Sequence, residues 1–211
     1  MAALVTVFIA AAGGTDWRRL ESVAETRYGD IGTDSVAAWR DLLSSASRKD
    51  TLEQLVTVND FFNSRVRWTT DSVLFGQSDY WATPLETLAL SAGDCEDFSI
   101  AKYVTLLELG VPASSLRLVY VKANRPGLAP QAHMVLAWYK KPGDAPMILD
   151  NINPMLLSAE QRQDLKPVFS FNHMDLWLGT GAQRSGADPR ARMARWQQVL
   201  NRTQAEGMTI K

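Results

Sequence analysis

The residues of this sequence that are best suited to chemistry lie in one short segment, Gly93-Asp94-Cys95-Glu96-Asp97. Cys95 is the only cysteine of the chain, and three carboxylates lie beside it. A free cysteine is most often a small buried apolar residue, but its thiolate is a strong nucleophile. The segment therefore combines a candidate nucleophile with three candidate cation ligands.

The residues around Cys95 indicate the start of a helix. Asp94 is a residue type that often caps a helix, and residues 98–109 have a helical period that ends before Gly110. In the first turn of a helix, the backbone N–H groups and the helix dipole favour a thiolate. The neighbouring carboxylates oppose this effect, because nearby negative charge raises the pKa of a thiol. We therefore expect a positive group that neutralises them.

The three carboxylates could bind that positive group. A helix turns about 100° per residue, so Asp94 and Asp97 can share a face while Cys95 points elsewhere. Oxygen ligands suit calcium or magnesium rather than zinc. The alternative is that Asp94 only caps the helix, and that Glu96 and Asp97 only complement its dipole.

Two predicted antiparallel strands, 133–139 and 147–150, carry a candidate base. If residues 140–143 form a four-residue turn, the register places His133 opposite Asp150. Directly opposed residues have Cβ atoms about 5 Å apart, which allows a hydrogen bond between an imidazole and a carboxylate. An aspartate on one nitrogen of a histidine leaves the other free to accept a thiol proton. The alternative is an ordinary surface pair.

The segment before the cysteine contains two candidate donors to an oxyanion. Residues 69–82 are predicted to form a loop, and Thr83 and Glu86 then form the capping pattern of a short helix over 84–90. Because this helix leads into the cysteine segment, Gln77 or Trp81 could offer a side-chain N–H to the reaction centre. For Trp81 the sequence favours a packing role.

The remaining elements form the scaffold. Residues 16–67 are predicted to form three helices, the third beginning at Asp50 with Glu53 in a capping box, and residues 116–122 alternate like a strand. The apolar stripes of the three helices are Trp17, Leu20, Ala24 and Tyr28; Val36, Trp39 and Leu43; and Leu52, Leu55, Val56, Asn59 and Phe62. Helices followed by strands indicate an α+β fold. His173 has no paired acid at a readable spacing and is interpreted as structural.

Composition excludes several classes of protein. With 22 basic and 23 acidic residues and a net charge of -1, the chain lacks the positive charge that nucleic-acid binding requires. One cysteine excludes an intramolecular disulfide and a multi-cysteine metal site. No apolar run is long enough to span a bilayer. Residues 1–14 resemble the apolar region and cleavage zone of a signal peptide, although no basic residue precedes them.

The end of the chain, from Asp188 to about Asn201, is predicted to form a basic amphipathic helix with an apolar face of Met193, Trp196 and Leu200. Its arginines are Arg190, Arg192 and Arg195. Such a helix can contact a membrane or a receptor, but we favour packing on its own domain.

Six motifs make the sequence similar to a known family. They are Trp81–Thr87, Gly93–Phe98, Ala101–Tyr103, Leu109–Pro112, Ala132–Leu136 and Leu149–Asn151. With them, the chain resembles the bacterial transglutaminase-like cysteine proteinases, and most closely the periplasmic members that process adhesins. The similarity extends from about residue 17 to residue 177.

The resemblance implies a papain-like or transglutaminase-like α+β core, with N-terminal helices packed on an antiparallel sheet and the nucleophile at a helix N-terminus. Cys95 would be the nucleophile, His133 the general base and Asp150 its partner. Calcium dependence would rest on Asp94 and Glu96, with Asp97 beside them.

The resemblance also implies a biological role. The substrate would be the N-terminal region of a large biofilm adhesin, and cleavage would release the adhesin from the cell surface. An inner-membrane receptor that responds to cyclic di-GMP would sequester the protease. A transglutaminase-type acyl transferase and a catalytically idle partner-binding module are the competing hypotheses.

The expected organisation has three parts. Residues 1–14 are a signal-peptide remnant or an arm, and residues 15–180 form the protease domain. The helical part of this domain covers about 15–110 and its sheet part about 115–180. Residues 181–211 form the C-terminal basic helix and tail.

Overall fold

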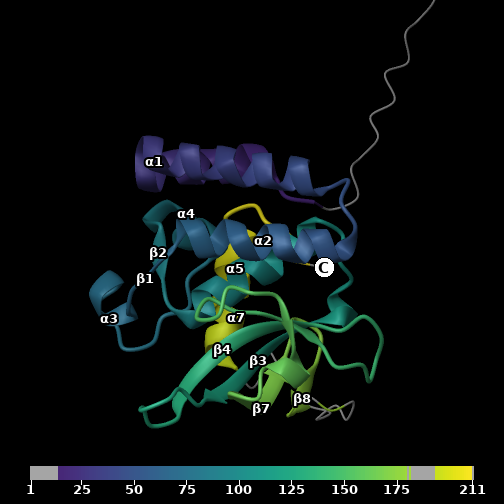
Figure 1. The fold of residues 1–211 in the computed structure, drawn as a ribbon. Helices are drawn as coiled ribbons and strands as arrows, with labels where there is room; N and C mark the ends of the chain where they lie inside the picture. Colours follow the sequence, from purple (N-terminus) through teal and green to yellow (C-terminus); the bar gives the residue numbers. More distant parts are fainter. Residues whose placement is uncertain (1–13, 180, 182–192, 211) are drawn as a thin grey trace, which may run out of the picture.

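The computed structural model describes residues 14–179, 181 and 193–210. The predicted signal-peptide segment, apart from Gly14, and the first residues of the predicted C-terminal helix lie outside this part. The described chain has helices on one side of a six-stranded antiparallel sheet, with strand order β6-β5-β4-β3-β7-β8 (Figure 1). This confirms the predicted α+β fold.

Two long helices form the outer layer, α1 (Trp17–Ala46) and α2 (Thr51–Arg65). The first two predicted helices are the two halves of α1, which is broken at Gly29, where φ is 57° and ψ is −141°. Glycine adopts this positive φ without the clash that a Cβ would cause.

Helix α2 begins with the predicted capping box, but its buried face differs from the predicted stripe. Leu52 and Val56 are 48% and 42% exposed. The buried positions are Gln54, Leu55, Val58, Asn59 and Phe62. Residues 55, 58, 59 and 62 follow the helical repeat, so the stripe is rotated and Leu52 and Val56 lie at its margin.

The segment between α2 and the cysteine is more structured than expected. It contains β1 (Arg67–Trp68), α3 (Asp71–Leu74), α4 (Pro84–Leu90) and β2 (Ala92–Gly93). The short helix α3 lies inside the region predicted to be a loop, whereas α4 has the predicted bounds. Strand β1 pairs in parallel with β2, just before the cysteine.

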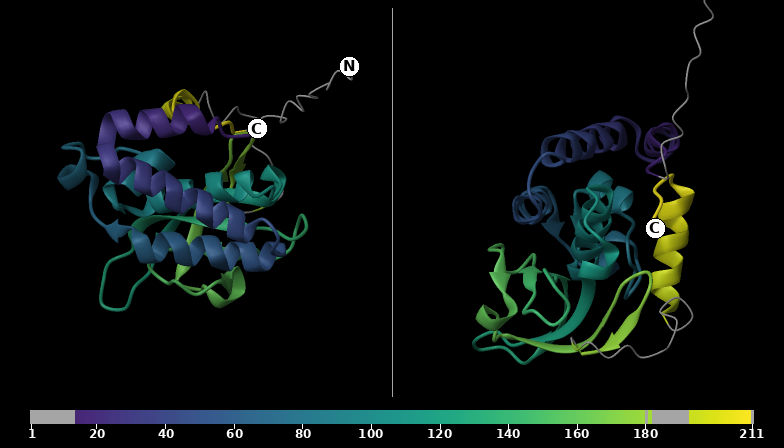
Figure 2. Two further views of the ribbon diagram at one scale, coloured as in Figure 1. Left: turned by 90° about the horizontal axis from the view of Figure 1, so that it is seen from above. Right: turned by 90° about the vertical axis from the view of Figure 1, so that its right-hand side faces the viewer.

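Helix α5 (Cys95–Glu108) lies at the centre of the molecule. The right-hand view of Figure 2 shows it between α2 on one side and the C-terminal helix on the other, with the sheet below. Its Ile100, Tyr103 and Leu106 are at most 1% exposed. Because neighbours surround α5, its first turn has a fixed position relative to the sheet.

The sheet is built from strands that follow α5 along the chain. They are β3 (Leu116–Ala123), β4 (Gln131–Trp138), β5 (Met147–Leu149), β6 (Leu157–Ser158), β7 (Leu165–Phe171) and β8 (Leu176–Leu178). Two single 3-10 turns, Ala113–Ser115 and Ala159–Gln161, precede β3 and follow β6.

The register between β4 and β5 corrects the predicted hairpin. The predicted register would pair Trp138 with Ala145, but Trp138 pairs with Met147, two residues further along. The connection is therefore longer than a four-residue turn. A shift of two residues keeps every side chain on the same face of the sheet, because the strand repeat is two.

The C-terminal helix α7 (Ala194–Ala205) belongs to the same hydrophobic core as the other helices. Trp196 is fully buried, and its ring packs at 6.0 Å from Tyr103 and 5.4 Å from Phe171. No helix of the described residues is long and apolar enough to cross a membrane.

Candidate active site

The first turn of α5 and the start of β4 border one cleft. Ser99 on α5 donates a hydrogen bond to the carbonyl oxygen of Met134 on β4 at 3.1 Å, which ties the helix to the strand. Cys95 and His133 both line the cleft, whose volume is about 670 Å³. The fold therefore brings the thiol and the imidazole to the same open space.

His133 and Asp150 form a buried pair behind the cleft. The distance from His133 Nε2 to Asp150 Oδ1 is 2.8 Å, and the two residues are 3% and 1% exposed. Asp150 directly follows the last residue of β5, and the β4–β5 register continued by one residue places it opposite Val135, two residues from His133 along β4. Side chains still reach across such a diagonal spacing. The predicted contact is therefore present although the predicted register was wrong.

The surroundings of Asp150 keep its carboxylate charged. Burial alone would raise its pKa, but hydrogen bonds from His133, the Ile152 N–H and Arg162 outweigh burial and hold the pKa well below its usual range. A charged carboxylate beside Nε2 of His133 favours a proton on Nε2. Nδ1 is then the nitrogen that is left to accept a proton.

Arg162 is a member of this site that the sequence analysis missed. It is 3% exposed and donates to Asp150 Oδ2 at 2.8 Å. It also donates to both oxygens of Asp164, at 2.8 and 2.9 Å. Arg162 follows a short 3-10 turn with no readable period, so the sequence offered no signal that it would reach Asp150.

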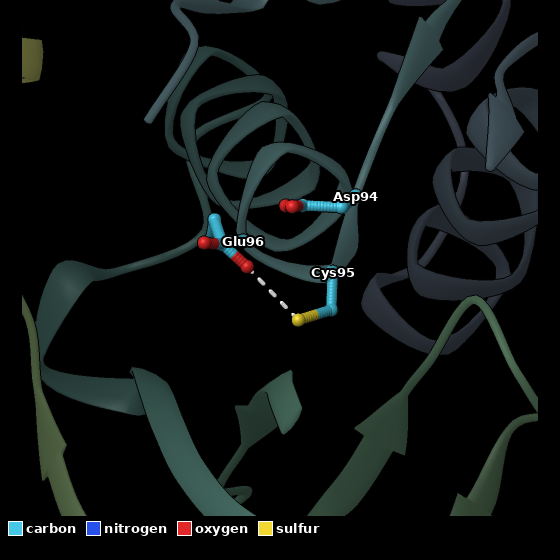
Figure 3. Close-up of side chains that lie close together, drawn as sticks. All are labelled: Asp94, Cys95 and Glu96. Carbon is cyan, nitrogen blue, oxygen red and sulfur yellow. Dashed lines mark hydrogen bonds between the residues drawn. The ribbon is translucent and has the colours of Figure 1, made fainter. Parts of the chain in front are cut away.

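The thiol of Cys95 points toward a carboxylate of its own segment (Figure 3). Its Sγ donates to Glu96 Oε2 at 2.9 Å. Burial raises the pKa of the Cys95 thiol, and the charge and hydrogen bond of Glu96 and the charge of Asp94 raise it further. A backbone hydrogen bond with Met134 opposes them only in part. Neutralising the carboxylates would therefore favour the thiolate.

The carboxylates near Cys95 form a larger cluster than the predicted set. Oxygens of Asp71, Asp94 and Asp97 lie within 4.8 Å of one another, and so do those of Asp71, Asp79 and Glu96. All three predicted ligands, Asp94, Glu96 and Asp97, belong to the cluster. Asp71 and Asp79 were missed, because they lie in the region predicted to be an unstructured loop.

The protonation of this cluster reflects its crowding. Burial, the charge of Glu96 and the hydrogen bond that Glu96 makes raise the pKa of Asp94 to about 10. Burial raises the pKa of Asp97 to about 8, although the Ala82 and Asp94 N–H groups hydrogen-bond its carboxylate at 2.7 and 3.1 Å. Asp71 and Asp97 are buried and the other acids of the cluster are partly buried, so this much negative charge is costly unless a cation or protons neutralise it.

The residues of the cluster fit a hard cation. Asp71 Oδ1 and Asp94 Oδ1 are buried and make no hydrogen bond within the described residues. Unpartnered buried oxygens are rare, and here both belong to the same group of acids. Oxygen donors of this kind suit calcium or magnesium.

Glycine at position 93 makes room for this arrangement. A Cβ at Gly93 would lie 2.8 Å from both Cβ and Oδ2 of Asp97. Only glycine allows Asp97 to fold back over its own helix start and accept the Asp94 N–H.

Neither predicted oxyanion donor lines the cleft. The indole N–H of Trp81 donates to Asp79 Oδ1 at 3.0 Å, and the ring stacks on Phe171 in the core. Gln77 is exposed and is not among the residues that line the cleft. The structure therefore supports the packing role of Trp81 and gives no support to either side chain as a donor.

Cys95, which begins a central helix, and His133, which is paired with Asp150 at the sheet, line the same cleft, as is expected of a transglutaminase-like cysteine enzyme. Comparisons with known proteins agree. The family model of the bacterial transglutaminase-like cysteine proteinases matches residues 34–165. The chain belongs to this family.

Solved structures of LapG from Legionella pneumophila match nearly the whole chain. One LapG structure is 36% identical, with a TM-score of 0.74 over 90% of this chain and 99% of that chain. An EGTA-treated form has the same identity and coverage and a TM-score of 0.77. A calcium-bound form, also 36% identical, has a TM-score of 0.75 over 89% of this chain and 98% of that chain. No curated protein sequence matched.

Proposed function

We propose that the chain is a calcium-dependent cysteine endopeptidase in which Cys95 is the nucleophile, His133 the general base and Asp150 the group that orients His133. The observation that carries the proposal is that Cys95 and His133 line one cleft while Asp150 holds Nε2 of His133 at 2.8 Å. This leaves the imidazole one nitrogen with which to accept a proton.

The chemical steps follow from this arrangement. His133 accepts the proton of the Cys95 thiol, and the thiolate attacks the carbonyl carbon of the scissile peptide bond. Backbone N–H groups in the first turn of α5 stabilise the oxyanion. The protonated His133 then gives its proton to the leaving amine, and water hydrolyses the thioester to restore Cys95.

Asp71, Asp79, Asp94, Glu96 and Asp97 would hold the metal. A calcium ion there would supply positive charge that offsets the carboxylates beside Cys95. The unpartnered oxygens of Asp71 and Asp94 support this assignment. The calcium-bound form of LapG supports calcium as the ion.

The similarity to LapG, which covers almost all of that chain, supports a finer assignment. As the family resemblance implies, the substrate is the N-terminal region of a large biofilm adhesin, cut in the periplasm to release the adhesin from the cell surface. A cyclic di-GMP-responsive inner-membrane receptor controls access to the protease.

The test is cleavage of a purified adhesin N-terminal fragment by the wild type and by Cys95→Ala, each with added calcium and with chelator. We expect cleavage only by the wild type with calcium. Cleavage by Cys95→Ala would overturn the nucleophile, and full cleavage after verified metal removal would overturn the calcium requirement.

A second readout separates hydrolysis from acyl transfer. If the wild type incorporates a labelled amine into protein and leaves the fragment uncut, the enzyme is a transglutaminase. If it does neither, the fragment is not its substrate or the fold serves to bind a partner, and an unchanged partner phenotype in Cys95→Ala would support the binding role.

A further inference from the structure

Lys102 lies inside the protein on the same helix as Cys95 and takes no part in the proposed chemistry. It is 1% exposed, and its Nζ donates to Asn59 Oδ1 at 2.9 Å and to Asn63 Oδ1 at 2.8 Å. Both asparagines come from α2. Burying an amine costs free energy, so its presence here indicates that its hydrogen bonds have a role.

The two asparagines hold the chain segment that begins with Asp150. Asn63 Nδ2 donates to the carbonyl oxygen of Asp150 at 2.8 Å. Asn59 Nδ2 donates to the carbonyl oxygen of Pro154 at 2.6 Å. The segment 150–154 is thus fixed at both ends, and its Asn151 and Ile152 line the cleft.

Lysine is suited to this task because its ammonium group has three N–H donors and no acceptor. An asparagine amide has a donor end and an acceptor end, and it can rotate to exchange them. With Nζ bonded to both Oδ1 atoms, both NH₂ groups must face the segment 150–154. An apolar side chain at position 102 would leave the two amides free to turn away.

Helix α5 therefore carries both Cys95 and Lys102, the residue that orients the two asparagines holding the Asp150 segment. Cys95 and Lys102 are about two turns apart on one helix. Through α2, the position of Asp150 is set relative to the helix that presents the thiol.

We propose that Lys102, acting through Asn59 and Asn63, is a positioning residue that fixes Asp150 and the adjoining cleft wall relative to Cys95. This inference rests on the proposed function, because it assigns Asp150 to the reaction. Burial lowers the pKa of Lys102 to about 7, since the charges of Asp150 and Asp60 offset it only in part. The neutral amine keeps two N–H groups, one for each asparagine oxygen.

The test compares Lys102→Met with Tyr103→Phe in the calcium-loaded enzyme. Tyr103 is the next residue of α5, is fully buried, and bonds His173 Nδ1 at 2.6 Å, away from segment 150–154. Tyr103→Phe is thus a matched loss of a buried hydrogen bond. We expect Lys102→Met to lower kcat on the adhesin fragment by about 10- to 100-fold with KM within about twofold, because small misplacements cost rates of this order. Tyr103→Phe should keep the wild-type kcat.

Two double variants identify the route. Asn63→Leu should lower kcat as Lys102→Met does, and the double variant Lys102→Met/Asn63→Leu should have a kcat no lower than either single variant. In the Asp150→Asn background, Lys102→Met should lower kcat by less than about twofold, since the effects of residues that act as one unit are not additive. If Lys102→Met does not fold, Asn63→Leu and its combination with Asp150→Asn give the same test.

The outcomes separate this inference from the proposed function. If Lys102→Met and Asn63→Leu both keep the wild-type kcat while Asp150→Asn loses activity, the positioning role is wrong and the triad stands. If Lys102→Met lowers kcat by the same factor in wild type and in Asp150→Asn, its effect does not pass through Asp150. If Asp150→Asn keeps the wild-type kcat, the triad itself is wrong, and the inference falls with it.

Discussion

Replacement of Arg162 by methionine removes the cation beside Asp150 and keeps a long side chain in the buried space. The change deletes three hydrogen bonds, one to Asp150 Oδ2 at 2.8 Å and two to Asp164 at 2.8 and 2.9 Å. Asp150 keeps His133 on its other oxygen, together with the Ile152 N–H. A buried carboxylate is left with fewer partners.

The magnitude follows from where each partner lies. Removing one member of a buried ion pair costs about 3–5 kcal/mol, whereas an exposed pair is worth about 0–1 kcal/mol. The Asp150 side chain is 0% exposed and that of Asp164 is 40% exposed. Most of the lost stability therefore comes from the bond to Asp150. Because Asp150 keeps its hydrogen bonds to His133 and Ile152, we expect a loss at the lower end of the buried range, about 3 kcal/mol in the free energy of unfolding.

The assay is urea unfolding at pH 7, with Asp164→Asn as the matched control. The control removes the exposed partner of the same arginine and should cost about 1 kcal/mol or less. The pKa of Asp150 is depressed in the folded state, so its contribution to stability is present above the unfolded pKa and is lost as the pH falls. In Arg162→Met this pKa should rise toward its unfolded value, so the loss of stability in acid should be smaller than in the wild type and should be complete at a higher pH.

One result would refute this reasoning. If Arg162→Met costs no more than Asp164→Asn, then Arg162 does not stabilise a charged Asp150, and the support assigned to the His133–Asp150 pair is wrong.

Two further predictions concern other buried carboxylates. Burial raises the pKa of Glu206 to about 7, so between the unfolded pKa and pH 7 the folded state keeps a proton that the unfolded chain releases, and the free energy of unfolding falls as the pH rises. In urea unfolding from pH 5 to pH 8, Glu206→Gln should therefore become more stable relative to the wild type as the pH rises. Parallel plots of unfolding free energy against pH would contradict this. Gly93→Ala should displace Asp97, because Cβ and Oδ2 of Asp97 lie 2.8 Å from the added Cβ. The variant should therefore lose the rise in melting temperature that we expect calcium to give the wild type. An unchanged rise would show that Asp97 is not needed for the calcium site.

Local signals predicted the helix starts well. The capping boxes of Asp50 with Glu53 and of Thr83 with Glu86 are both present, and α4 and α5 begin where their caps indicate. Caps are local, so they can be read without knowing the fold. By contrast, the connection between β4 and β5 covers residues 139–146 and is longer than the four-residue turn that the sequence analysis assumed.

The parts of the site that were missed are the long-range ones. Arg162 and Asn63 contact Asp150, and Asn59 contacts Pro154, only because α2 and the segment after β6 fold onto the same place. The sequence analysis treated α2 as scaffold alone, yet its two asparagines fix the segment that carries Asp150. Such contacts have no sequence spacing from which to predict them.

The acidic cluster shows the same limit. Asp94, Glu96 and Asp97 are neighbours in sequence and were predicted together. Asp71 joins them because β1 pairs with β2 and places α3 beside the start of α5.

The most direct test of the central claim is the steady-state rate of adhesin-fragment cleavage by Cys95→Ala, His133→Ala and the double variant, in calcium and with folding verified by circular dichroism. A nucleophile and its base act as one unit, so each single variant should lose as much activity as the double variant, at least about a thousandfold. Wild-type cleavage by His133→Ala, or losses that multiply in the double variant, would contradict a Cys95–His133 reaction centre.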